Sequence, residues 1–419
     1  MTALPPVGRR LAVVVQRFGD QINGGAEAHA RLLVRALSPH AQIDVLTSRA
    51  LDYREWKPVL PAGIESRDGV RVIRFDHASA QRGRARHTPL KHKVRFKLRR
   101  WLPADRPRVA APRGDPASDG ERFLAAQGPT MPGLIEWLAQ RGSDYAALLF
   151  MTARFHPSAM GVFVNPGRSI LIPTLHDEKA MYLPYFHRVF RAPHQILYNT
   201  AAEQRLAHRL YGPDLAPGSV CGIGIDLPDA QALAAASRAE PMGAPYLLYL
   251  GRVDRGKGCD ELFRHFTRWL DASGQALRLV VAGQLAMPKP RDPRIECVGF
   301  VDEPTKWRLL CGATALVIPS RHESLSMVLL EALAVGTTVI ANRDSEVLAD
   351  HLAAAQMGFT YGDENGFRSA LRSCLERDPA ARAAEAARGR QYVEQHYAWP
   401  VVTAKLLAAI ERIEDGRSG

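Results

Sequence analysis

Cysteine is scarce in this chain, and long hydrophobic runs are missing. The 419 residues include five cysteines, an odd number with no pair at the spacing of a metal site: Cys221, Cys259, Cys297, Cys311 and Cys374. Such scattered cysteines are typical of reduced thiols in a cytoplasmic protein. The first apolar run, LAVVV, soon meets Arg17 and Asp20 and is too short for a signal sequence, and no window approaches a membrane-spanning length. We therefore expect a cytoplasmic protein that is soluble or bound to a membrane surface.

Two signatures of cofactor chemistry are also absent. The sequence has no Asp-x-Asp motif and no His/Cys cluster, so we expect neither a metal nor another cofactor. No G-x-G-x-x-G motif follows the first predicted strand, and the acidic ribose ligand that would follow about 20 residues later is not evident. These absences argue against a dinucleotide-dependent oxidoreductase.

Acidic residues are nearly absent from one segment. The chain carries a formal net charge of +12, and between Arg82 and Arg113 twelve lysines and arginines stand against a single acid, Asp105. Apolar residues fall on one stripe of a predicted helix over residues 90–102: Leu90, Val94, Leu98, Trp101 and Leu102. A basic amphipathic helix with a tryptophan is typical of binding to an anionic membrane surface. The alternative is a solvated charged face with Leu98 and Trp101 packed on the N-terminal domain, and nucleic acid is not an expected partner.

Predicted strands and helices alternate along the chain, which indicates parallel sheets covered by helices on both faces. In the first half the expected strands are residues 11–16, 43–47, 70–75, 147–151, 169–173 and 196–198, and helices begin near Ala26, Pro132, Pro184 and Ala201. In the second half the expected strands are 246–250, 277–282, 295–298, 315–319 and 339–341, before a last helix over 399–413. Residues 103–120, rich in proline, glycine and aspartate, predict a flexible loop. The length of 419 residues fits two domains of about 200 residues, with a linker near 222–244.

Two glutamates, Glu323 and Glu331, stand eight residues apart in the sequence RHESLSMVLLEALAVG of residues 321–336. The apolar run before them predicts a strand and VLLEALAV predicts a helix, so Glu323 lies in a polar loop and Glu331 in the helix. Such a junction directs backbone N–H groups and the positive end of a helix dipole at an anion, most often phosphate. A carboxylate beside an anion site is suited to bind neutral sugar hydroxyls. The pattern therefore predicts a nucleotide-sugar site.

Two cations follow another predicted strand. Arg252 and Lys257 lie five residues apart in a glycine-rich loop that begins at Gly251, at the carboxyl end of the strand over 246–250. The ligand crevice of an open parallel sheet opens at that edge. Two cations there suit a diphosphate, since each charge-assisted hydrogen bond is worth about 1.5 to 3 kcal/mol. A solvated basic turn is the alternative.

Together these motifs resemble the retaining GT-B glycosyltransferases of family 4. The glutamates resemble the family's Glu-x7-Glu signature. Residues 246–258 resemble its strand, Gly-Arg loop and lysine, and residues 299–301 resemble the turn that lies over the nucleotide base. Residues 13–37 resemble its N-terminal strand, glycine loop and first helix. The resemblance implies an α/β fold of two Rossmann-like domains that face a cleft. It implies an N-terminal acceptor domain over 1–225 with the basic insert 82–113, a nucleotide-sugar-binding domain over 226–398, and a C-terminal helix over 399–419 that crosses back to the N-terminal domain.

The resemblance also implies roles for individual residues. Glu331 would bind ribose hydroxyls, and Glu323 would bind and orient the transferred sugar without acting as a nucleophile. Arg252 and Lys257 would stabilise the charge that grows on the leaving diphosphate, in place of a metal. The other donor-binding residues implied are Gly251, Phe300, Val301 and the backbone N–H groups of Ser324, Leu325 and Ser326.

The N-terminal domain contributes three candidates. Gly24 and Gly25 follow the first strand and would let the backbone approach a phosphate, although an ordinary tight turn would look the same. His176 follows a predicted strand end and resembles the histidine that some family members place beside the transferred sugar, with a surface histidine as the alternative. Two segments depart from the family pattern: residues 341–346 lack the glycines expected before Glu346, and Gly222 stands where asparagine is frequent.

The sequence therefore predicts a retaining, metal-independent hexosyltransferase that uses a nucleotide-diphosphate sugar. The Ala- and Arg-rich composition is typical of GC-rich bacterial genomes. With the basic segment it favours a lipid-linked or nascent surface polysaccharide (O-antigen, capsule or exopolysaccharide) as the acceptor, at the inner face of the inner membrane. The alternatives are a non-catalytic sugar-nucleotide-binding module and, behind it, a dinucleotide oxidoreductase.

Overall fold

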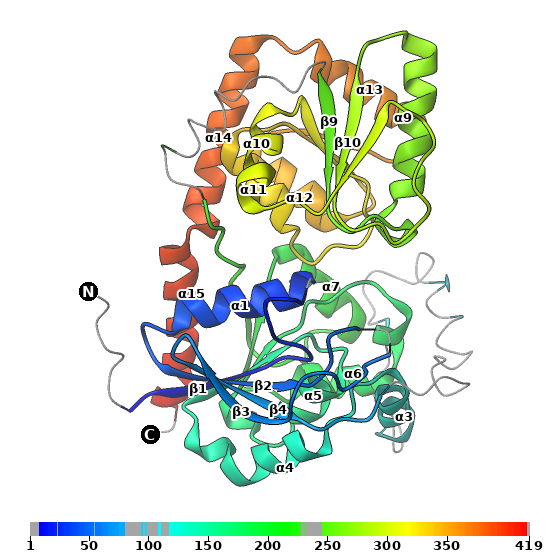
Figure 1. Cartoon of the computed structure of the whole chain (residues 1–419). Helices are drawn as coiled ribbons and strands as arrows, with labels where there is room; N and C mark the ends of the chain where they lie inside the picture. Colours follow the sequence, from blue (N-terminus) through cyan, green and yellow to red (C-terminus); the bar gives the residue numbers. More distant parts are fainter. Residues whose placement is uncertain are drawn as a thin grey trace. The chain divides into compact units, whose positions relative to one another are not determined.

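The computed structural model divides the chain into two compact units. It describes residues 8–22, 24–53, 55–79, 117–227 and 245–416, together with Val94, Lys97, Leu98, Arg108, Val109 and Gln231. Unit 1 comprises Met1–Ile223 and Val402–Gly419, and unit 2 comprises Gly224–Val401 (Figure 1). Each unit is built on its own sheet, so each is described by itself.

Within its described residues, unit 1 contains an eight-stranded sheet in the order β3-β4-β2-β1-β5-β6-β7-β8. Neighbouring strands are parallel except β3, which runs antiparallel to β4 at one edge. The strands are β1 (Arg10–Val14), β2 (Gln42–Ser48), β3 (Gly63–Arg67), β4 (Val70–Phe75), β5 (Ala147–Met151), β6 (Ser169–Ile172), β7 (Gln195–Tyr198) and β8 (Gly218–Val220). The central strand β5 is buried along its whole length because helices cover both faces of the sheet.

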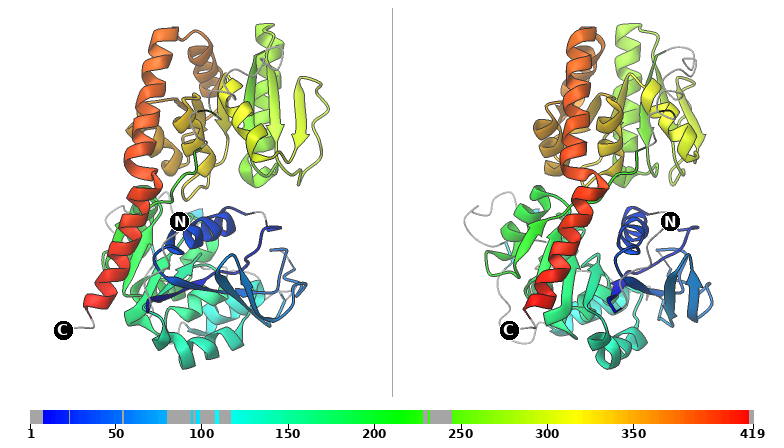
Figure 2. Two further views of the ribbon diagram at one scale, coloured as in Figure 1. Left: turned by 60° about the vertical axis from the view of Figure 1, so that its left-hand side comes forward. Right: turned by 90° about the vertical axis from the view of Figure 1, so that its left-hand side faces the viewer.

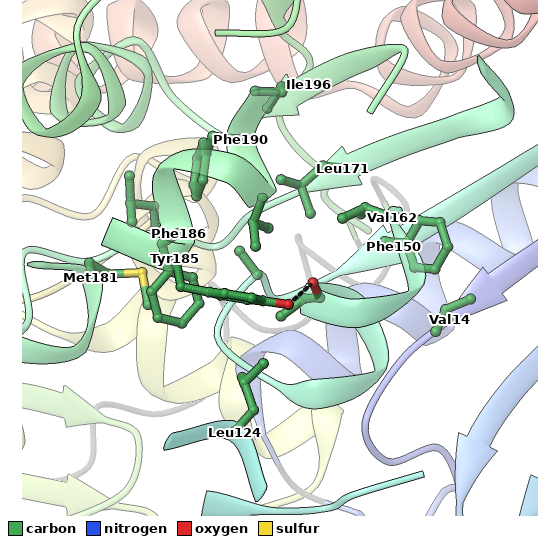
Figure 3. Close-up of a cluster of buried hydrophobic side chains, with 14 of the residues drawn as sticks. Val14, Leu124, Phe150, Val162, Leu171, Met181, Tyr185, Phe186, Phe190 and Ile196 are labelled. Carbon is green, nitrogen blue, oxygen red and sulfur yellow. Dashed lines mark hydrogen bonds between the residues drawn. The ribbon is translucent and has the colours of Figure 1, made fainter. Parts of the chain in front are cut away.

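The helices of unit 1 supply the rest of its core. Helix α1 lies on one side of the sheet and α4 on the other (Figure 1). A cluster of buried side chains joins the strands to α6 through Phe186 and Phe190, and the buried Tyr185 hydroxyl donates a hydrogen bond of 3.1 Å to the Ala159 carbonyl (Figure 3). The helices are α1 (Gly25–Leu37), α3 (Ala117–Gln127), α4 (Pro132–Arg141), α5 (His156–Gly161), α6 (Pro184–Arg191) and α7 (Ala201–Tyr211).

Unit 2 contains a six-stranded parallel sheet within its described residues, in the order β11-β10-β9-β12-β13-β14. Its strands are β9 (Tyr246–Leu250), β10 (Arg278–Ala282), β11 (Ile295–Gly299), β12 (Ala315–Ile318), β13 (Val339–Asn342) and β14 (Phe359–Tyr361). Its helices are α9 (Cys259–Ser273), α10 (Glu303–Gly312), α11 (Met327–Val335), α12 (Glu346–Ala355), α13 (Glu364–Leu375) and α14 (Pro379–Tyr397). The strand order places β9 and β12, which precede the two candidate loops, side by side.

The last helix, α15 (Trp399–Asp415), begins in unit 2 and belongs to unit 1 from Val402 onward. From Val402 onward the helix lies against the rest of unit 1 (Figure 2). Its residues Leu406 and Ile410 are buried, and the Gln195 side chain of β7 donates to the Ala409 carbonyl. Near its end Glu414 pairs with Arg9, which precedes β1. The prediction of an α/β chain whose last helix returns to the N-terminal domain is thus confirmed.

The structure also corrects and limits the sequence predictions. Strands β3, β8 and β14 were not predicted, and the predicted loop over 103–120 is wrong for residues 117–120, which start α3 because Phe123 and Leu124 pack into the core. The basic segment 82–113 lies largely outside the described residues. Its described members Val94 and Leu98 are exposed by 44% and 51%, and their backbones form one helical hydrogen bond.

Buried histidines make both units sensitive to acid. Burial lowers the pKa of His29, His156 and His351 to about 4, from an ordinary value of 6.5. The unfolded chain therefore binds protons that the folded chain excludes, so the stability present above about pH 6.5 is lost as pH falls toward 4, by up to about 3 kcal/mol for each histidine.

We predict that His351→Gln makes the pH dependence of the free energy of unfolding shallower between about pH 6.5 and pH 4. Denaturant unfolding followed at several pH values measures this slope. The control His322→Gln, which replaces an exposed histidine, leaves the slope unchanged. An unchanged slope in His351→Gln contradicts the prediction.

Candidate active site

Three glycines let strand ends approach one another at the carboxyl edge of the unit 2 sheet. Gly251 follows β9, Gly283 follows β10 and Gly299 ends β11, with φ of 139°, 144° and 76°. The Gly251 amide donates to Ala282 at 3.0 Å and the Gly283 amide to Gly299 at 2.7 Å. A Cβ atom on Gly283 would lie 1.9 Å from the Gly251 carbonyl oxygen, so only glycine fits there. Ligands of open parallel sheets bind at this edge.

The turn after Gly251 is fixed by an acid that the sequence analysis did not single out. Asp254 accepts a hydrogen bond of 2.8 Å from the Lys257 amide and pairs with the Arg252 guanidinium. Burial alone would raise the pKa of Asp254, but the hydrogen bonds from Arg252 and from the Lys257 backbone hold it below the ordinary value. Asp254 is therefore a carboxylate that holds both predicted phosphate ligands in one short turn, and the Arg252 side chain stays 45% exposed.

Lys257 and Glu323, predicted to bind diphosphate and sugar, pair with each other. The Lys257 ammonium lies 2.7 Å from Glu323 Oε1, and the two side chains are 34% and 13% exposed. Gly258 makes this contact possible, because a Cβ atom there would lie 2.7 Å from the Pro319 carbonyl oxygen. The turn of Arg255–Lys257 can thus approach the end of β12. The Glu323 carboxylate neutralises the charge of Lys257.

The loop from Ser324 to Ser326 leads into α11, as predicted. Ser326 is the N-cap residue with a left-handed φ of 70°, unusual for a residue with a side chain. Among the described residues, its side chain makes no capping hydrogen bond to the first turn, which leaves the helix start without the usual internal acceptor. Leu325 and Ser326 are buried. A strained and uncapped helix start is suited to an external anion.

Glu331 lies in α11 and pairs with a lysine that the sequence analysis missed. Lys306, on α10, places its ammonium 2.7 Å from Glu331 Oε1 and 2.8 Å from Glu303. Burial raises the pKa of the Glu331 carboxyl above its ordinary value, and the Lys306 ammonium opposes that rise. Glu331, the residue expected to bind ribose, therefore has one of its two carboxylate oxygens paired with Lys306.

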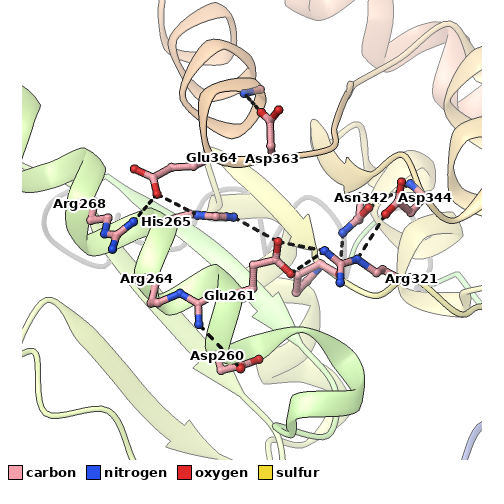
Figure 4. A network of polar contacts seen from close by, with 12 residues as sticks. Asp260, Glu261, Arg264, His265, Arg268, Arg321, Asn342, Asp344, Asp363 and Glu364 are labelled. Atoms are coloured by element: carbon pink, nitrogen blue, oxygen red, sulfur yellow. Dashed lines mark hydrogen bonds and ion pairs between the residues drawn. The ribbon is translucent and has the colours of Figure 1, made fainter.

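A partly exposed ion-pair network lies behind the Glu323 loop. Arg321, two residues before Glu323, bonds Glu261 of α9 at 3.0 Å and Asp344 at 3.4 Å. His265 lies between two carboxylates, 3.4 Å from Glu261 and 3.7 Å from Glu364 (Figure 4). The network connects α9, α13 and the segment after β13 to the loop, and it fixes the backbone that carries Glu323.

The predicted base-binding turn follows β11. Phe300 is 74% exposed, while Val301 is partly buried. A large exposed aromatic ring at the carboxyl edge of the sheet can stack on a planar base. The predicted donor-binding side chains thus follow three strands of the unit 2 sheet. Arg252 and Lys257 follow β9, Glu323 follows β12 and Phe300 follows β11.

The three candidates predicted in the N-terminal domain, Gly24, Gly25 and His176, lie in unit 1. Gly24 is the N-cap residue of α1, where a Cβ atom would lie 2.1 Å from Glu27, whose carboxylate forms a buried pair of 2.6 Å with Arg17. Packing against this pair is thus sufficient reason for glycine at position 24. A Cβ atom on Gly25 would meet no described atom within 4 Å. His176 follows β6, and its neighbour Leu175 donates its amide to the buried Glu203 at 2.5 Å.

Known proteins share both the sequence and the fold. Residues 244–377 match the family described as Glycosyl transferases group 1. The glycogen synthase of Mycobacterium tuberculosis is 31% identical over 219 residues, which cover 49% of this chain and 51% of that protein. The phosphatidyl-myo-inositol mannosyltransferase of Mycolicibacterium smegmatis is 25% identical over 295 residues, 66% of this chain and 73% of that protein. Residues 244–377 therefore belong to the group 1 glycosyltransferases.

The fold of this chain is the GT-B fold. Sucrose-phosphate synthase from Thermosynechococcus elongatus superposes with a TM-score of 0.65 and 17% identity, covering 97% of this chain and 100% of that one. The resemblance to GT-B transferases of family 4 is therefore confirmed, although the chain matches only about half the length of the glycogen synthase. In the described part of the chain, no three His, Cys, Asp or Glu side chains could hold a metal ion. Helices long and apolar enough to cross a membrane are also absent from the described ranges.

We predict that Glu323→Gln increases the affinity for a nucleoside diphosphate by a factor of about 2 to 5, because Lys257 loses the partially exposed carboxylate that competes with phosphate. Isothermal titration with UDP, GDP and ADP measures this effect. The control Glu296→Gln removes another carboxylate of unit 2, paired with Arg278 at 2.9 Å, and leaves the affinity unchanged. A lower affinity in Glu323→Gln would show that Glu323 binds the nucleotide itself.

Proposed function

We propose that the protein is a retaining glycosyltransferase that moves a hexose-type sugar from a nucleotide-diphosphate sugar to a glycan or lipid-linked acceptor. The observation that carries the proposal is the joint placement of Glu323, Lys257 and Arg252 at the carboxyl edge of one sheet, beside the uncapped start of α11. The family membership and the names of the relatives, a glycogen synthase and a mannosyltransferase, support sugar transfer.

The chemistry follows from the charges of these residues. Arg252 and Lys257 would contact the diphosphate and stabilise the negative charge that develops as the bond to the sugar breaks. Phosphate binding withdraws Lys257 from Glu323, and the released carboxylate can then accept hydrogen bonds from sugar hydroxyls. The departing phosphate takes the proton of the acceptor hydroxyl, which attacks from the same face and retains the anomeric configuration. Glu323 orients the sugar in this scheme, and the cations make a metal unnecessary.

We predict that purified protein releases nucleoside diphosphate from one of the UDP-, GDP- or ADP-sugars, and that the sugar product keeps the donor's anomeric configuration in NMR spectra. A thermal-shift screen identifies the donor first, since a ligand at 100 times its Kd stabilises the folded protein by about 2.7 kcal/mol. Arg252→Ala lowers kcat/KM by about tenfold or more, the value of one charge-assisted hydrogen bond. Arg255→Ala removes an equal charge from the same turn and has little effect. Binding without turnover of any donor would favour a non-catalytic binding module.

The acceptor is proposed to be a lipid-linked or nascent surface polysaccharide (O-antigen, capsule or exopolysaccharide) at the inner face of a bacterial inner membrane. Support comes from the local charge of residues 82–113 and from the exposure of Val94 and Leu98, the described apolar members of the predicted stripe. The name of the mannosyltransferase relative includes a lipid, phosphatidyl-myo-inositol. The protein would then act as a peripheral membrane enzyme.

We predict that liposomes with anionic lipid sediment the protein at low salt and that binding weakens as salt rises, since each basic residue near the surface contributes about 1 kcal/mol. Changing Lys93, Lys97 and Arg100 to Glu abolishes this binding without changing donor hydrolysis. Liposomes of neutral lipid serve as the control. Failure of the wild-type protein to bind anionic liposomes at low salt contradicts the membrane proposal.

A further inference from the structure

Lys306 occupies a position between two acids of different exposure. Its ammonium contacts Glu331, whose side chain is 14% exposed, and Glu303, which is 72% exposed. The ammonium also lies 4.6 Å from the centre of the Trp307 ring, and the Lys306 side chain is itself only 16% exposed. A desolvated cation against a largely buried carboxylate is a stronger and less screened pair than a surface salt bridge.

The geometry leaves one oxygen of Glu331 for a ligand. Lys306 contacts Oε1, and within the described residues no other hydrogen bond or ion pair to Glu331 occurs. The charged groups that face this carboxyl are Lys306 and Glu303 on α10 and Asp226 before the start of the unit 2 sheet. Two of the three are acids, so Lys306 is the one group among them that favours the ionised carboxylate.

We propose that Lys306 is a positioning residue for nucleotide recognition: it keeps Glu331 ionised and holds Oε1, so that Oε2 accepts hydrogen bonds from vicinal ribose hydroxyls. The inference rests on the proposed function, in which Glu331 binds ribose. In contrast to Lys257, which exchanges Glu323 for phosphate, Lys306 stays on its glutamate when the nucleotide binds. Specificity for ribose over other sugars thus depends on a residue that does not touch the ligand.

The test compares a ribonucleoside diphosphate with its 2′,3′-dideoxy analogue, using whichever of UDP, GDP and ADP binds. Wild-type protein prefers the ribonucleotide, and Lys306→Met reduces this preference by about tenfold, the value of one hydrogen bond to a charged group. In Lys306→Met the ribonucleotide affinity also falls more steeply with decreasing pH than in the wild type, because the buried carboxyl group without the ammonium takes up a proton more readily. The dideoxy analogue shows no such difference between the two proteins.

Two further variants separate positioning from general damage. Lys306→Arg keeps the cation and the pH dependence of the wild type, while Glu303→Gln removes only the exposed partner and leaves ribose discrimination intact. Equal preference for ribose in Lys306→Met and wild type, with both folded by circular dichroism, overturns the inference. Failure of the wild type itself to distinguish the two nucleotides would instead overturn the ribose assignment of Glu331 within the proposed function.

Discussion

The ion pair between Lys257 and Glu323 is the contact on which the arrangement of the proposed donor site depends. It joins the turn after β9 to the loop after β12. Each of its two side chains neutralises the charge of the other at the edge of the sheet. The second signature glutamate, Glu331, has its own lysine at the same distance of 2.7 Å. The two lysines differ in exposure, 34% for Lys257 and 16% for Lys306. The more exposed lysine can change partners when an anion arrives, whereas the enclosed one is suited to a permanent contact.

The surrounding fold supports this pair through backbone geometry. Gly258 lets the cationic turn approach Pro319, and Asp254 holds the turn by accepting the Lys257 amide. On the other side, Arg321 fixes the Glu323 loop to α9 through Glu261. A loop held by these ion pairs keeps its carboxylate in place, which reduces the ordering that a donor would impose on binding. The candidate site is therefore held together by contacts within unit 2.

Much of the fold could be predicted because apolar runs mark buried parallel strands. The bounds of β4, β5 and β9 agree with the predicted ranges, because β5 and β9 are short apolar runs and β4 has four apolar residues among its six. The edge strands were missed for physical reasons: β3 is exposed along its length, and β8 and β14 have three residues each, too few for a pattern. In the site, the sequence indicated the residues that meet the ligand but not their partners. Lys306 and Asp254 act through contacts in three dimensions, and in the sequence each looks like an ordinary charged residue near a helix start.

The central claim is that phosphate replaces Glu323 as the partner of Lys257. A crystal structure of the protein with bound nucleoside diphosphate tests it most directly. The account predicts that the Lys257 ammonium lies within hydrogen-bonding distance of a phosphate oxygen and has left Glu323, while Lys306 remains on Glu331. A phosphate bound elsewhere, with the Lys257–Glu323 pair intact, would contradict it.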